Sequence, residues 1–115
     1  MLIESESVAA GSFVYSAPAV ATSRVALVEV ARAVKRADPG ADALADAGTL
    51  LVPFLLVDVD EEVLRHAAEL TGSLRSLDAI HLASALTIGA DSMLVYDLRL
   101  ADAVEAAGLT VVAPT

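Results

Sequence analysis

The clearest succession of helix and strand in this chain lies at residues 76–110, which read SLDAIHLASALTIGADSMLVYDLRLADAVEAAGLT. Apolar residues cover most of the surface of a helix at 76–88, so this helix is expected to pack on more than one side. Gly89 is expected to end it. The short apolar run at 93–96 suits a buried strand of a parallel sheet, and a second helix is expected at 98–107. This succession indicates an α/β fold.

Two acids stand at the ends of these elements. Asp78 falls in the first turn of its helix, where the helix dipole stabilises a carboxylate by about 0.3–1 kcal/mol. Asp97 follows the strand and would cap the next helix, which is worth about 1 kcal/mol. These structural roles explain both residues. However, ligands of doubly wound α/β sheets bind at the carboxyl edge, and both acids converge there if the helix at 76 also begins at that edge.

Composition predicts one soluble domain covering residues 1–115, large enough to fold without a metal or a disulfide. The chain has no cysteine, which fits a cytoplasmic protein. No apolar run is long enough to span a membrane, and Glu4 and Glu6 stand where a signal peptide would carry basic residues. Hydrophobic residues make up 57% and mean hydropathy is +0.67, so we expect a partner surface for a second copy or another protein.

The net charge of −9 argues against passive binding of nucleic acid, but it is compatible with a nuclease that recruits metal ions. Three basic residues lie close to expected helix starts at the edge where the acids are placed: Arg24, Arg75 and Arg99. Our hypothesis is that they contact the phosphate groups of a nucleic acid around an acidic centre. The alternative is that they are solvated loop arginines.

The rest of the chain alternates between helix and strand in the same way. Residues 1–10 are expected to be weakly helical, and 19–22 to form a short strand. Helices are expected at 24–37, 42–47 and 60–71. Between the last two, the alternation around 51–59 and its proline predict an edge strand.

Three further polar residues of the predicted helices have ordinary structural explanations. Glu29 lies at the rim of the polar face of its helix and is expected to pair with Arg32 at i+3, for about 0.2–0.5 kcal/mol. His66 and His81 have no Cys or His partner at a metal-binding spacing, so we expect them to be packing or surface residues.

Three segments of the chain resemble PIN-domain ribonucleases of the VapC toxin type: SRVALVEVARAV, SLDAIHLASAL and LVYDLRLADAVEAAGL. The similarity runs from about Thr22 to the C-terminus. It implies a three-layer α/β/α domain with a parallel sheet ordered 3-2-1-4-5. It also implies a carboxylate cluster that binds Mg²⁺ or Mn²⁺ and cleaves RNA with a metal-activated water. By motif, the catalytic and metal-binding acids would be Glu29, Asp78 and Asp97. A cognate VapB-type antitoxin and a homodimer are the expected partners.

The chain departs from the family at its beginning. PIN domains of this type start with a central strand that ends in an aspartate, whereas the first residues here, MLIE, resemble the end of the helix that follows that strand. Neither Glu4 nor Glu6 has the surroundings of the missing acid. We therefore expect a domain truncated at its N-terminus and lacking the first strand. Such a domain would be less stable than a complete one, since buried unpaired backbone groups cost about 1–3 kcal/mol each, or it would close the gap by rearrangement.

Two other classes of function stay open. One is a catalytically inactive PIN-like remnant that acts only by binding an antitoxin or a second copy. The other is an unrelated α/β module whose acids are helix caps. Metal binding that depends on Asp78 and Asp97 would exclude the unrelated module. Metal-dependent RNA cleavage would separate the ribonuclease from the inactive remnant.

Overall fold

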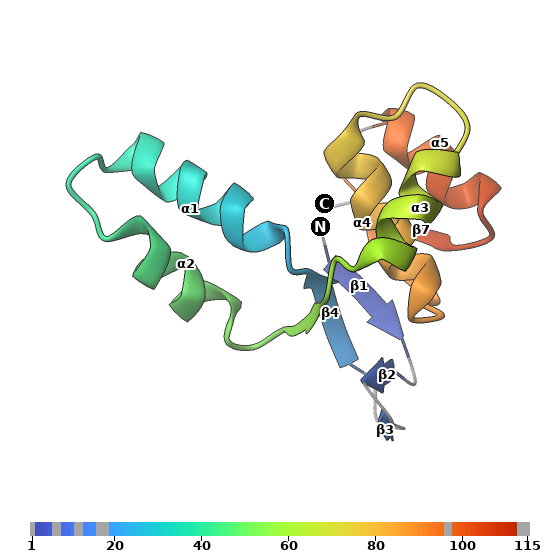
Figure 1. Ribbon diagram of the computed structural model, residues 1–115, viewed down its shortest axis with the longest axis horizontal. Helices are drawn as coiled ribbons and strands as arrows, with labels where there is room; N and C mark the ends of the chain where they lie inside the picture. Colours follow the sequence, from blue (N-terminus) through green and yellow to red (C-terminus); the bar gives the residue numbers. More distant parts are fainter. Residues whose placement is uncertain (1, 6–7, 11–12, 16–18, 96–97, 113–115) are drawn as a thin grey trace.

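The computed structural model describes residues 2–5, 8–10, 13–15, 19–95 and 98–112. Within them, five strands form the main sheet: β1 (Leu2–Ser5), β4 (Ala19–Ser23), β5 (Leu55–Val57), β6 (Ser92–Leu94) and β7 (Thr110–Val112). A separate hairpin pairs β2 (Val8–Ala10) with β3 (Phe13–Tyr15). The helices are α1 (Ala26–Ala37), α2 (Ala43–Leu51), α3 (Glu61–Glu69), α4 (Ser76–Thr87) and α5 (Leu98–Ala106). Figure 1 shows their arrangement in space.

The strand order of the main sheet is β5-β4-β1-β6-β7. Numbered along the chain, this order is 3-2-1-4-5, as expected from the sequence, and with its flanking helices it is consistent with the three-layer α/β/α class. The edge position predicted for the strand around 51–59 is confirmed, because β5 lies at one end of the sheet. β4 pairs with β5 in parallel, and so does β6 with β7.

The centre of the sheet differs from the expectation. β1 is antiparallel to both β4 and β6, so the sheet is mixed instead of parallel throughout, while its strand order is the one expected. The weak helix expected at residues 1–10 is also wrong, because Leu2–Ser5 and Val8–Ala10 are strands. The sequence left two outcomes for the central position of the sheet: a less stable domain with a gap, or a rearrangement that closes the gap. The structure shows a rearrangement, in which the first residues of this chain form the central strand.

Burial and connection length explain this arrangement. Ile3 stands opposite Ala21 on one side and Met93 on the other, and all three side chains are fully buried. A strand in this position satisfies backbone groups on both neighbours, which outweighs a weak local preference for helix. A parallel neighbour to β4 would need a crossover connection, usually a helix, whereas antiparallel strands can be joined by a much shorter turn. The described residues between β1 and β4 form a short hairpin, so the antiparallel direction follows.

Helix α4 stands at the centre of the packing. Leu82 and Ala85 join the main core with residues of β1, β4, β6 and α5. Ala79 and Ala83 form a second core with Val63 and Ala67 of α3. The prediction that the helix at 76–88 packs on more than one side is therefore confirmed. Gly89 follows it with φ of +68°, a left-handed conformation that glycine adopts readily.

Helices α1 and α2 run side by side and project away from the sheet and from α3–α5 (Figure 1). We call residues 26–51 the arm. Its second helix begins at Asp42, whose side chain accepts a hydrogen bond from the backbone N–H of Ala45 at 3.3 Å. This helix extends four residues beyond the predicted end at 47. None of the helices in the described part of the chain is both long and apolar enough to cross a bilayer.

Candidate functional site

Asp78 is held at the start of α4. It lies in the first turn, where the helix dipole favours a carboxylate, and it is 9% exposed. Arg75, immediately before the helix, donates a hydrogen bond from Nε to Oδ2 of Asp78 at 3.3 Å. Thus this acid is nearly buried, and its charge has a cationic partner on the same chain segment.

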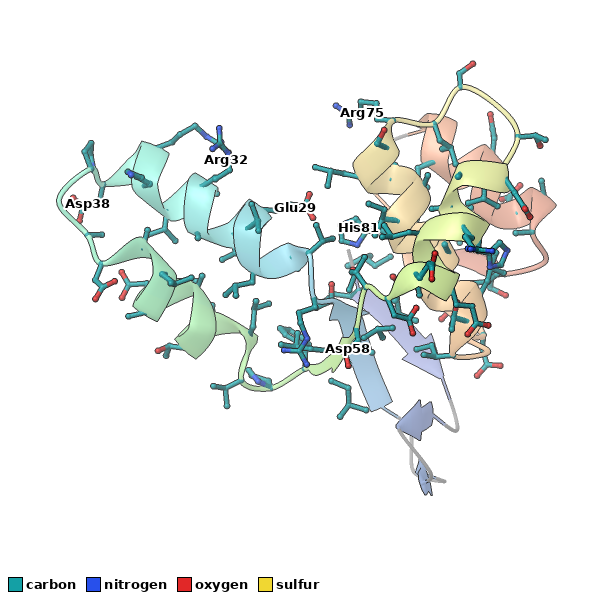
Figure 2. The ribbon with its side chains drawn as sticks, viewed as in Figure 1. Glu29, Arg32, Asp38, Asp58, Arg75 and His81 are labelled. Atoms are coloured by element: carbon teal, nitrogen blue, oxygen red, sulfur yellow. The ribbon has the colours of Figure 1, made fainter. Side chains whose placement is uncertain are left out.

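Glu29 lies in the first turn of α1, just after the carboxyl end of β4. Its Oε1 lies 2.5 Å from Nε2 of His81 on α4, and Figure 2 shows the two side chains facing one another. The ion pair expected between Glu29 and Arg32 is not among the contacts that the structure describes, so that prediction is wrong. The physical reason is that α1 begins directly after β4 and its first turn lies beside α4. There the buried imidazole of His81 needs a hydrogen-bond partner.

His81 is 1% exposed and lies one helical turn after Asp78. Burial lowers the pKa of His81, because a charged imidazole is poorly solvated there, while the hydrogen bond to Glu29 and the charges of Glu29 and Asp78 act in the opposite direction. Its Nδ1 is buried without a hydrogen-bond partner among the described residues. The expected packing role is therefore correct but incomplete, since His81 also contacts a predicted site acid.

The structure thus places Glu29 in contact with His81, and a second predicted acid, Asp78, nearby on the same helix as that imidazole. Glu29 and His81 are 52 residues apart in the chain, whereas Asp78 lies one turn before His81 on α4, where its charge acts against the lowering of the His81 pKa. The i, i+3 spacing of Asp78 and His81 was a signal in the sequence that both share one helix face. Asp97 lies outside the described residues, so its place in the cluster stays a prediction.

Two of the three predicted phosphate-binding arginines pair with carboxylates. Arg24 Nε lies 2.6 Å from Oδ1 of Asp58 in an exposed ion pair, and Arg75 contacts Asp78 as described above. The side chain of Arg99 lies outside the described part. Arg24 and Arg75 would each have to exchange or share this carboxylate to bind a phosphate, so their role as phosphate contacts stays a prediction.

The donor chemistry of the site fits a hard divalent ion in part. Among the described residues, no group of three His, Cys, Asp or Glu side chains is arranged to hold a metal ion. Glu29 and Asp78 nevertheless provide carboxylate oxygens, which Mg²⁺ and Mn²⁺ prefer, and such ions keep several waters as ligands. The residues present therefore suit such an ion without completing a protein ligand set.

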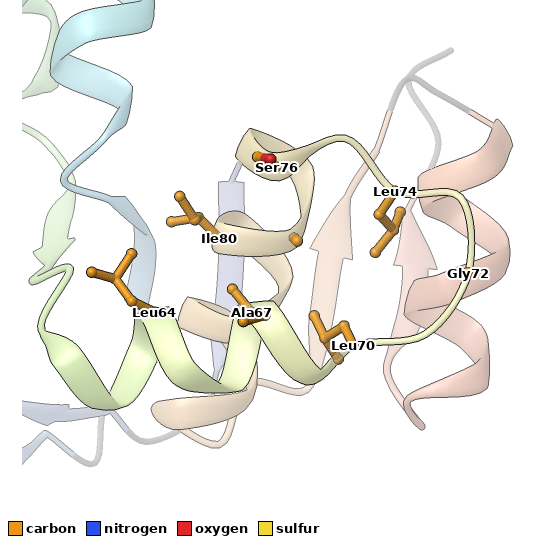
Figure 3. Close-up of a pocket in the computed structure, with 9 residues that line it drawn as sticks. Leu64, Ala67, Leu70, Gly72, Leu74, Ser76 and Ile80 are labelled. Carbon is orange, nitrogen blue, oxygen red and sulfur yellow. The ribbon is translucent and has the colours of Figure 1, made fainter.

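A pocket of about 370 Å³ lies between α3, the following loop and α4 (Figure 3). Its lining contains Leu64, Leu70, Leu74 and Ile80 and no ionisable side chain. Consequently it has no group for acid–base or metal chemistry, and the acidic cluster is the better candidate for a functional site.

Comparison with known proteins gives the same family as the sequence motifs. The family model described as PIN domain matches residues 4–106. The chain is 40% identical to Ribonuclease VapC35 of Mycobacterium tuberculosis over 103 residues, covering 81% of this chain and 71% of the relative. It is 39% identical to Ribonuclease VapC46 of the same species over 97 residues, covering 82% and 73%. No solved structure matches. Because the family model spans most of the chain and these relatives are matched over most of their length, the chain belongs to the PIN-domain family.

Proposed function

We propose that this protein is a Mg²⁺- or Mn²⁺-dependent ribonuclease, the toxin of a type II toxin–antitoxin system. The two relatives are named VapC ribonucleases and are about 40% identical to it over the aligned residues. The observation that carries the proposal is the contact of Glu29 on α1 with His81 on α4, 52 residues away in the chain and one helical turn after Asp78. Both acids stand at positions where the family motifs place catalytic carboxylates.

In this proposal Glu29, Asp78 and Asp97 hold the ion directly or through water. When bound, a divalent ion makes a coordinated water more acidic and stabilises charge that develops on the phosphodiester. The protein's own contribution is to keep mutually repelling carboxylates close together, which is unfavourable unless a cation is present. Arg75 offsets part of that repulsion at Asp78. Arg24, Arg75 and Arg99 are proposed to contact phosphate groups of the RNA.

The proposed partners are a cognate VapB-type antitoxin and a second copy of the chain, in the cytoplasm. Support comes from large apolar side chains of the arm and the residue after it, which are exposed: Val28, Leu44, Leu50 and Val52. Where exposed apolar side chains form a continuous surface, that surface marks an interaction site.

A catalytically inactive PIN-like protein that acts only by binding partners is the second candidate. Two observations favour it: no three-acid group is present among the described residues, and the central strand runs antiparallel to its neighbours.

Calorimetric titration with Mn²⁺, followed by RNA cleavage assays, tests the proposal. We expect binding and cleavage by the wild-type chain, and loss of both in Asp78→Asn and Asp97→Asn. Glu62→Gln is the matched control, because Glu62 is an exposed first-turn acid of α3 away from the cluster. A folded wild-type chain that binds no Mn²⁺ would contradict the ribonuclease and favour the inactive protein.

A further inference from the structure

We infer that His81 is a positioning residue of the site: its Nε2–H donates to Glu29 and holds that carboxylate toward the acidic cluster. This inference rests on the proposed function for the role of the cluster, but the contact itself is independent of it. The sequence predicted a packing or surface role for this histidine, and the resemblance to the family assigns it no role in the site.

The two partners of this hydrogen bond differ in how firmly they are held. The imidazole is 1% exposed within α4, the most deeply packed helix of the molecule, so its ring has a defined place. The Glu29 side chain is 41% exposed and sits at the base of the arm, which projects from the rest of the molecule (Figure 2). Packing alone does not fix a side chain that is 41% exposed. A fixed donor at 2.5 Å selects the rotamer that faces α4.

The contact with Glu29 also indicates which ring nitrogen of His81 carries the hydrogen. An ionised carboxylate only accepts hydrogen bonds, so the nitrogen that faces Glu29 must carry a hydrogen. That nitrogen is Nε2, whereas Nδ1 has no hydrogen-bond partner in the described structure. A neutral imidazole with its hydrogen on Nε2 meets this requirement. It orients Oε1 while leaving the negative charge of Glu29 and its Oε2 for a cation.

Hydrogen bonds to a ligating side chain commonly matter for metal affinity. Substituting such an outer partner typically weakens metal binding 10–100-fold, because the ligand is no longer held in its binding orientation. A histidine that merely fills space in α4 would influence folding but not the ligand's orientation. The two roles therefore predict different results for substitutions that keep or remove the donor.

Two substitutions of His81 separate these roles. His81→Gln keeps an N–H donor close to the position of Nε2, whereas His81→Leu fills similar space without a donor. Ser84→Ala is the matched control: Ser84 is also buried on α4, but its hydroxyl donates to the backbone carbonyl of Ile80 in the same helix. Circular dichroism and thermal unfolding establish that each variant is folded.

The first measurement uses the full chain without metal. Nitrogen-15 NMR of the histidine side chains is expected to show His81 with its hydrogen on Nε2, and Glu29→Gln is expected to shift that hydrogen's resonance. A hydrogen on Nδ1, or no response to Glu29→Gln, would overturn the inferred contact.

The second measurement is Mn²⁺ affinity by calorimetry. We expect His81→Leu to raise Kd about 10–100-fold, His81→Gln to recover most of that loss, and Ser84→Ala to match the wild type. Equal affinities of folded His81→Leu and wild type would overturn the positioning role, as would equal losses in both His81 variants. If the wild type binds no Mn²⁺, the ribonuclease proposal fails and the role in metal binding fails with it, while the NMR result still decides the contact.

Discussion

The arm and helix α4 both come from well-patterned helical sequence, but they bury very different shares of their side chains. In α4, seven of the twelve residues are buried, including polar Asp78, His81 and Ser84. Along the arm, the buried residues of the two helices are Ala26, Ala47 and Leu51. The difference teaches that an apolar stripe predicts a helix with a contact face, whereas the extent of burial depends on what the fold places against that face.

The candidate site lies where these two regions meet. Asp78 and His81 come from the deeply packed helix, and Glu29 comes from the base of the exposed arm. One half of the site is therefore held by the core, and the other half depends on a few contacts such as the hydrogen bond to His81.

The largest expected effect is on the free energy of unfolding, and it compares a buried residue of α4 with an exposed residue of the arm. Leu82 is 1% exposed in the main core, so Leu82→Ala is expected to lower the free energy of unfolding by about 2–5 kcal/mol through lost burial and a cavity. The same change at exposed Leu44 of the arm is expected to alter it by less than about 0.5 kcal/mol. Urea unfolding measures both. A loss at Leu44 as large as that at Leu82 would show that the arm is packed against something in solution.

The pH dependence of stability reports on the contact between the two regions. Burial lowers the pKa of His81 from its ordinary value of 6.5, so just below that pH the unfolded chain binds a proton that the folded chain does not. The free energy of unfolding should therefore fall as the pH drops below about 6.5, by at most about 1.4 kcal/mol per pH unit for one proton. We expect His81→Leu to lack this component in urea unfolding at a series of pH values. An unchanged pH slope in that variant would contradict the shift.

Matched helix caps test whether the arm unfolds together with the core. Asp60 caps α3 by accepting from the N–H of Val63 at 3.0 Å, and Asp42 caps α2 in the same way. Asp60→Ala is expected to cost about 1 kcal/mol of global stability. Asp42→Ala is expected to cost less and to accelerate amide hydrogen exchange within α2, because an exposed helix can open locally. Equal global losses would mean that arm and core are one cooperative unit.

The smallest effect is expected at the exposed ion pair at the base of the arm. Arg24 precedes α1 and Asp58 follows β5, and both side chains are more than half exposed. Arg24→Ala should change the free energy of unfolding by about 0.2–1 kcal/mol, and less at high salt, because water and ions screen such pairs. Arg65→Ala, which removes the exposed pair with Glu61 on α3, is the matched control. A larger, salt-independent loss at Arg24 alone would show that this pair fixes the arm.

Local patterns predicted the helices and most of the strands of the main sheet. The helix of residues 76–88, the strand that follows it and the edge strand near Pro53 are recognisable because periodicity, caps and proline act over a few neighbouring residues. Motif order also predicted the strand order of the sheet and the family, and it singled out Glu29, Asp78 and Asp97 as candidate acids of one site. Their catalytic roles, and the place of Asp97, stay predictions.

Other features depend on residues that lie far apart in the chain, and no local pattern reports them. Residues 2–5 form a strand because Ala21 and Met93 bury Ile3 between them, and its antiparallel direction follows from the hairpin that leads to β4. Glu29 contacts His81 instead of Arg32 because β4 brings the start of α1 to α4. Secondary-structure propensity and helix capping act over a few neighbouring residues. The sequence by itself therefore determined the helices and strands and the acids that stand at their ends. Strand direction, burial and the partner of Glu29 arise from long-range packing, which exists only once the elements are assembled.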